Sequence, residues 1–114
     1  MTVIKGIPVP PSTNALYRNV AGKGRVRTER YVTWANAAGW LIQAQRPDRV
    51  PGRICLDISV QRQRANSDIS NRIKAVEDLL VALGVIDDDK NVDQVTIRWA
   101  SITGCNITIT PSVA

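Results

Sequence analysis

A stretch of helical periodicity at residues 70–83 constrains the fold of this chain more than any other feature. Its apolar residues recur at steps of three and four: Ile73, Val76, Leu80 and Leu83. Gly84 follows and can end the helix. Such a helix needs an apolar surface to cover, and apolar and polar residues alternate at 54–60 as they do in a half-buried strand. The sequence therefore predicts a helix packed on a sheet.

The remaining segments extend this pattern. Residues 2–9 alternate and are β-branched, which predicts a first strand, and residues 31–45 have helical spacing. Residues 92–100 and 106–110 predict two strands joined as a hairpin at 101–104. The resulting order β, α, β, α, β, β predicts an α+β fold, with two main helices on one small mixed sheet. All 114 residues are expected to form one domain.

The charge of the chain favours an anionic partner. The net charge is +5, and nucleic acid is the commonest partner of a basic domain. Residues 12–30 predict a long, mobile and exposed basic loop. Arg62 and Arg64 stand two apart at the end of the predicted strand 54–60 and would share one face. A solvated loop and a solvated strand end would show the same pattern. The candidate DNA-binding residues are Lys23, Arg25, Arg27, Arg30, Arg62, Arg64 and Arg72.

Several classes of protein are excluded. The apolar stretches are too short to cross a bilayer and the N-terminus lacks a signal-peptide core, so we expect a cytoplasmic protein without a membrane partner. The chain has no His, which excludes zinc held by His and acid-base chemistry by His. Cys55 and Cys105 lack the spacing of metal ligands and are expected to be buried free thiols.

Acidic residues are concentrated in one part of the chain. Of ten carboxylates, seven fall between Asp68 and Asp93. Adjacent carboxylates repel each other, and a hard divalent cation such as Mg²⁺ would neutralise them. Mg²⁺ with carboxylate ligands suits phosphodiester cleavage. The alternative is that Asp68 only caps the helix and residues 87–89 form a solvated turn.

Lys74 is expected to lie beside these acids. At about 100° per residue, Ser70, Lys74 and Glu77 fall on one polar stripe of the predicted helix. Lys74 could stabilise a scissile phosphate or orient an attacking water. It could equally form an ordinary helix salt bridge with Glu77.

Two motifs in this chain carry a family resemblance. Near the start, PVPPSTNALYR contains Pro10, Pro11, Ser12 and Asn14. In the centre, SDISNRIKAVEDLLVALGVIDDDKNV contains Asp68, Asn71, Lys74, Asp87 and Asp88. Together they resemble the RusA family of Holliday junction resolvases, which are small dimeric endonucleases of bacteria and their prophages. The resemblance spans nearly the whole chain.

The resemblance implies a function and a set of site residues. It implies a homodimer with a Mg²⁺-dependent endonuclease activity that resolves four-way DNA junctions in recombination and repair, with Mn²⁺ as an alternative ion. Asp68, Lys74 and Asp88 would be catalytic. The expected metal ligands are Asp68 and Asp88, helped by Asp87. Glu77 is a further candidate ligand because of its place on the predicted helical stripe, and not through the resemblance. Water would attack the scissile phosphorus while Lys74 supports the developing charge.

One departure from the family pattern leaves a second reading open. Ser70 stands where the family usually has its second aspartate, and a hydroxyl is a poorer ligand for Mg²⁺. Glu77, on the same predicted stripe, could restore the missing carboxylate, whereas Asp78 is expected to be structural. The alternative is a non-catalytic module that binds branched or single-stranded DNA, although few aromatic residues are available for stacking on bases.

Overall fold

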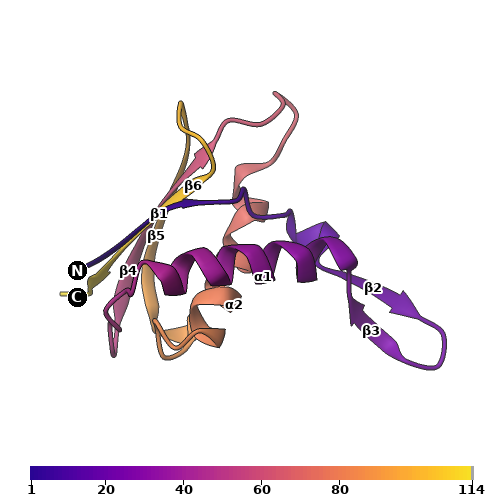
Figure 1. The fold of residues 1–114 in the computed structure, drawn as a ribbon, viewed down its shortest axis with the longest axis horizontal. Coiled ribbons are helices and arrows are strands. Elements are labelled where there is room, and N and C mark those ends of the chain that lie inside the picture. Colours follow the sequence, from indigo (N-terminus) through magenta and orange to yellow (C-terminus); the bar gives the residue numbers. More distant parts are fainter. Residues whose placement is uncertain (114) are drawn as a thin grey trace.

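A four-stranded mixed sheet forms the centre of the protein in a computed structural model that describes residues 1–113 (Figure 1). Its strands are β1 (Thr2–Ile7), β4 (Ile54–Gln61), β5 (Val92–Ala100) and β6 (Cys105–Pro111), in the order β1-β6-β4-β5. β4 runs parallel to β5 and antiparallel to β6, which in turn runs antiparallel to β1. The two directions of pairing make the sheet mixed, as the sequence predicts.

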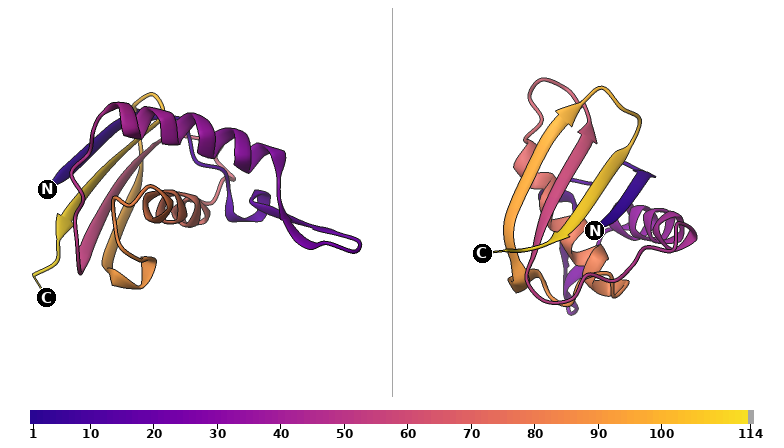
Figure 2. Two further views of the ribbon diagram at one scale, coloured as in Figure 1. Left: turned by 60° about the horizontal axis from the view of Figure 1, so that its bottom comes forward. Right: turned by 90° about the vertical axis from the view of Figure 1, so that its left-hand side faces the viewer.

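Two helices cover one face of this sheet and leave the other face uncovered (Figure 2). α1 spans Glu29–Ala44 and α2 spans Ile73–Ala82. Every second residue of β4 is buried toward the helices because the strand alternates strictly. The core is completed by the buried residues of the helices, namely Tyr31, Trp34, Ala38, Ile42, Ala75, Val76, Leu79 and Leu80. The prediction of an α+β fold with two main helices on a mixed sheet is confirmed.

The predicted hairpin between the last two strands is wrong. β5 and β6 do not pair with each other, because β4 lies between them. The β4–α2–β5 segment is a crossover that places β5 parallel to β4 on one side, and β6 occupies the other side. Residues 101–104 therefore cross the end of β4, where the Gln61 N–H donates to the Gly104 carbonyl at 2.7 Å.

The predicted long loop at residues 12–30 is also wrong in part. It contains a two-stranded sheet of β2 (Tyr17–Val20) and β3 (Gly24–Arg27), joined by a tight turn. Gly22 and Gly24 have φ of +79° and +73°, which the turn requires and which glycine adopts at no steric cost. The β2–β3 hairpin projects from the body of the protein at the N-terminal end of α1 (Figure 1).

The N-terminal part of the predicted helix 70–83 has a different geometry. Residues Ile69–Arg72 form a 3-10 turn, η2, and the α-helix begins only at Ile73. The step of 100° per residue does not extend back to Ser70, so the predicted stripe of Ser70, Lys74 and Glu77 does not form as one α-helical face. Two shorter 3-10 turns are η1 (Thr13–Ala15) and η3 (Asp89–Asn91).

Candidate active site

Lys74 lies between two carboxylates on the exposed side of α2. Its Nζ is 3.0 Å from Asp78 Oδ1 and 3.5 Å from Asp89 Oδ2. The hydrogen bond to Asp78 is the main reason that the pKa of Lys74 is raised, with further contributions from Asp89. Lys74 is therefore protonated at neutral pH. The expected alternative, a salt bridge between Lys74 and Glu77, does not form, because Asp78 one residue further on is the i+4 partner.

Glu77 is a half-buried carboxyl next to this group. Burial is the main cause of its raised pKa, and the charges of Asp89 and Asp78 raise it further, while Lys74 lowers it. The fold therefore disfavours the ionised form of Glu77 as long as no additional cation is close.

Asp68 caps the turn η2 and remains accessible. Its Oδ1 accepts two hydrogen bonds from Ser70, from the backbone N–H at 3.2 Å and from Oγ at 2.8 Å. Ser70 thus does not take the place of a carboxylate, but holds one oxygen of Asp68. The capping interpretation is confirmed for Asp68, and capping leaves its second oxygen free for another ligand.

The three consecutive aspartates after α2 point to different neighbours. Asp87 accepts from the Gly52 N–H at 3.1 Å and pairs with Arg49. These two interactions hold the pKa of Asp87 below its usual range, with Gly52 as the larger cause. Asp88 caps η3 by accepting from the Lys90 N–H at 3.0 Å, which is the largest cause of its lowered pKa. Of the three, Asp89 alone contacts Lys74.

The carboxylates do not form a ready-made metal cage. Within residues 1–113 no three side chains of His, Cys, Asp or Glu gather closely enough to hold an ion. Their chemistry nevertheless fits Mg²⁺, which prefers oxygen ligands and is usually bound by one or two carboxylates together with waters and phosphate oxygens.

A groove joins the acidic group to the base of the β2–β3 hairpin. It has a volume of about 370 Å³ and is lined by Tyr17, Arg27, Tyr31, Asp78, Val81, Ala82 and Asp89. Arg27 lies over the ring of Tyr31 at 5.4 Å, and Arg25 lies over the ring of Tyr17 at 4.6 Å. These cation-π contacts orient the two arginines but leave their charges available to phosphate.

The predicted DNA-binding residues fall into three places. Lys23, Arg25 and Arg27 are exposed on the hairpin, and Arg30 is exposed in the first turn of α1. Arg62 and Arg64 lie in the loop after β4, so the expectation that a strand puts them on one face is wrong. Arg72 ends η2 and is half-buried.

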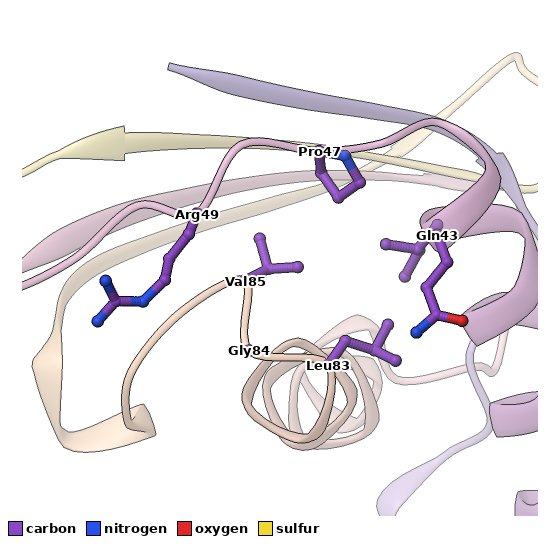
Figure 3. Close-up of a pocket in the computed structure, with 7 residues that line it drawn as sticks. Gln43, Pro47, Arg49, Leu83, Gly84 and Val85 are labelled. Carbon is purple, nitrogen blue, oxygen red and sulfur yellow. The ribbon is translucent and has the colours of Figure 1, made fainter.

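The pocket shown in Figure 3 lies away from this chemistry. Its volume is about 280 Å³, and it is formed by the ends of α1 and α2 and the intervening loop, with Ile42, Gln43, Pro47, Arg49, Leu83, Gly84 and Val85 as its lining. The guanidinium of Arg49 points away from the rest of the lining (Figure 3). Because it offers one charged group and no carboxylate, we assign it no catalytic role.

The comparison with known families agrees with this geometry. The sequence model of the family described as endodeoxyribonuclease RusA matches residues 7–110. The chain belongs to the RusA family. Its activity is that of an endodeoxyribonuclease that acts on Holliday junctions, and its substrate class is branched DNA. No curated protein matches the sequence.

Other features agree with this assignment or leave it unchanged. RusA resolvases depend on divalent metal ions, which is consistent with a group of carboxylates beside Lys74. Neither helix within residues 1–113 has the length and apolarity to cross a membrane. Cys55 and Cys105 are free thiols; Cys105 is buried and Cys55 is half-buried.

Sequence reasoning missed two carboxylates that contact Lys74. Asp78 could have been found, because it lies at i+4 from Lys74 on the helix. Asp89 belongs to a run of three aspartates, and no local signal tells which member turns toward α2. Tyr31 carries helical core spacing, so nothing in the sequence indicates that its ring also lines the groove.

Proposed function

We propose that this enzyme nicks four-way DNA junctions with Mg²⁺ as its metal, and that Mn²⁺ can replace Mg²⁺. The observation that carries this proposal is the position of Lys74, which lies against Asp78 and Asp89 where a groove leads to the basic hairpin. A nuclease of a polyanion needs acidic and basic groups side by side, because the acids hold a cation and the bases attract phosphate. This groove supplies both.

We propose that up to two carboxylates from the set of Asp68, Asp88, Asp89 and Glu77 would hold the metal, with waters and phosphate oxygens in the other positions. Asp68 has one carboxylate oxygen free, and Glu77 is disfavoured as an anion until a cation neutralises it. A bound divalent ion would polarise the scissile phosphate and lower the pKa of a water molecule. We assign Asp87 to structure instead, since Arg49 and the Gly52 N–H already engage its carboxylate.

Lys74 is proposed to stabilise the charge that develops on the phosphate during cleavage. Asp78 fixes the ammonium group from within the same helix and keeps it protonated. A donor that is oriented before the reaction begins does not have to reorganise when charge appears. Asp78 is thus proposed as a positioning residue. Arg62, Arg64 and the hairpin cations are proposed to hold the backbone of the DNA.

The proposed assembly is a homodimer that acts in recombination and repair. A four-way junction is close to two-fold symmetric, and paired nicks need two active sites related by the same symmetry. Because the substrate is DNA, we also propose that the enzyme works in the cytoplasm.

The test is Mg²⁺-dependent nicking of a synthetic four-way junction by the purified protein and four variants. Mutation of a residue that only hydrogen-bonds a metal ligand commonly lowers metal affinity or activity by about 10–100-fold. Loss of a direct ligand should cost more, so Asp68→Asn and Asp89→Asn should each lower the nicking rate by more than about 100-fold. Lys74→Ala should lower the rate strongly in a folded protein that still binds the junction.

Asp87→Asn is the matched control, because it changes the same residue type two positions from Asp89. It should keep nearly the parental rate. Loss of activity in Asp87→Asn with retention in Asp89→Asn would reject the assignment of the ligands. A parent that binds junctions but nicks none with either Mg²⁺ or Mn²⁺ would reject the proposed function and favour a binding module.

A further inference from the structure

Arg72 is a partly buried cation without an anionic partner. One guanidinium nitrogen, Nη1, donates to the carbonyl oxygen of Pro10 at 2.8 Å. Its Nε is buried and has no acceptor among residues 1–113. Burial, followed by the charge of Arg30, lowers the pKa of Arg72. The fold thus holds this guanidinium in place while leaving part of its hydrogen-bonding capacity unused.

Three other arginines of this protein are neutralised by aspartates. Arg49 pairs with Asp87, Arg53 with Asp93 and Arg98 with Asp57. No carboxylate of the described chain lies within ion-pair distance of Arg30 or Arg72.

Two neighbouring cations without a counterion are costly, and more so where one is removed from water. An external anion would relieve this cost. Guanidinium groups bind phosphate through paired, charge-assisted hydrogen bonds, which gives phosphate an advantage over a simple ion such as chloride.

We propose that Arg72 and Arg30 form a seat for one DNA phosphate, next to the scissile phosphate on the same strand. This inference rests on the proposed nuclease function and adds a subsite to it. Asp68 caps the start of η2 and Arg72 ends it, so a rise of about 2 Å per residue separates their backbone positions by about 8 Å along the turn. Because both residues belong to one short turn, a strand that reaches the metal site at Asp68 also passes close to Arg72.

The surroundings of Arg72 fix the seat before DNA arrives. Thr13 Oγ1 donates to the Asn71 carbonyl at 2.9 Å, and Arg72 itself binds the Pro10 carbonyl, so η2 is tied to the loop after β1 at two points. Arg30 lines an open groove of about 580 Å³ together with Pro8, Glu29, Thr33, Trp34 and Ala37. This groove has room for the nucleotide attached to the bound phosphate. The carboxylate of Glu29 on its wall opposes an anion.

The test follows the Arg72 Nε–H resonance by ¹⁵N NMR in the metal-free protein, with assignment by its loss in Arg72→Lys. The probes are the oligodeoxynucleotide dT4 and inorganic phosphate. We expect dT4 to shift this resonance saturably and at lower concentration than inorganic phosphate. Arg30→Gln should weaken the apparent affinity of dT4 about tenfold, as the loss of one charge-assisted contact predicts, and Glu29→Gln should tighten it. Arg98→Gln, which removes an already neutralised cation, is the control and should change nothing.

Two results would overturn the inference. The first is an Arg72 resonance that stays in place while dT4 shifts other signals. The second is an equal loss of apparent affinity for dT4 in Arg30→Gln and in the control Arg98→Gln. A stronger response to inorganic phosphate than to dT4 would also overturn it, because the seat would then bind a free anion rather than DNA.

Junction nicking is measured on the same protein preparations after Mg²⁺ is added, to separate the two proposals. Nicking without movement of the Arg72 resonance rejects the seat and leaves the nuclease. A shifted resonance in a protein that does not nick rejects the nuclease and supports the seat.

Discussion

The β2–β3 hairpin should account for a defined part of the salt dependence of DNA binding. The variant replaces Lys23, Arg25 and Arg27 by Ala, three cations that have no ion-pair partner within residues 1–113. Each cation that neutralises a phosphate of duplex DNA contributes about 0.9 to the slope of log K against log salt. The slope should therefore fall by about 2.7 for each hairpin that is bound.

This change in slope is large enough to measure directly. Raising the salt from about 50 to about 200 mM should weaken binding of the parent roughly 40-fold more than binding of the variant, if all three cations contact phosphate. The assay is fluorescence anisotropy with a labelled four-way junction in EDTA, so that the DNA stays intact. Circular dichroism checks that the variant is folded.

A second triple variant tests whether position or net charge matters. Replacing Arg49, Arg53 and Arg98 by Ala also lowers the net charge from +5 to +2, but these three arginines are paired with aspartates. Its slope should stay near that of the parent. Equal slopes for the two triple variants would refute the reasoning, since net charge rather than the hairpin would then control binding. A parental slope in the hairpin variant would place the hairpin away from the path of the DNA.

Three further predictions concern stability and reactivity. Because the pKa of Glu77 is raised in the fold, ionisation of this carboxyl destabilises the metal-free protein as the pH rises above about 4.5. Glu77→Gln should therefore raise the Tm at pH 7 in EDTA but not below about pH 4.5. An unchanged Tm at both pH values would contradict the burial argument. Gly104→Ala would place a Cβ 2.4 Å from a backbone oxygen of β1, whereas Gly84→Ala has a similar positive φ but open space around the new Cβ. In urea denaturation the free energy of unfolding of Gly104→Ala should therefore be about 1–3 kcal/mol lower than that of Gly84→Ala. Equal losses in the two variants would show that backbone conformation alone matters. Burial raises the pKa of the Cys105 thiol to about 12, so a thiol reagent should modify only the half-buried Cys55 in the folded protein. The modified residues are identified by mass spectrometry of a digest. Modification of Cys105 in the absence of urea would disprove its burial.

The parts of the fold that follow from local periodicity could be predicted from the sequence. The alternation at 54–60 gives β4 within one residue, because a strand buried on one face has to alternate. The order of strands could not be predicted. Whether β6 pairs with β5 or with β4 depends on packing between distant segments, and neighbours in sequence are only the commoner choice.

The candidate site shows the same division between local and distant determinants. The grouping of acids near Lys74 follows from the sequence, because helix α2 and the turn after it bring them close. The choice among Asp87, Asp88 and Asp89 depends on Arg49 and Gly52, which come from a loop more than 30 residues earlier. The sequence could not place Ser70 because the same residue types can begin a 3-10 turn or an α-helix, although the two differ in hydrogen bonding, residues per turn and rise.

The position of β6 between β1 and β4 has a consequence for how the chain folds. The first strand finds its partner only in the last one, since Thr2 pairs with Ile109. During synthesis, the edges of β1 and β4 that pair with β6 therefore remain unpaired until residues 105–111 have left the ribosome. Contacts at such long sequence separation form slowly, and unpaired edges expose a chain to aggregation while it waits. A ribosome-bound chain that stops before residue 105 should therefore be protease-sensitive throughout the sheet, and release of a chain that includes residues 105–111 should make the sheet resistant in one step.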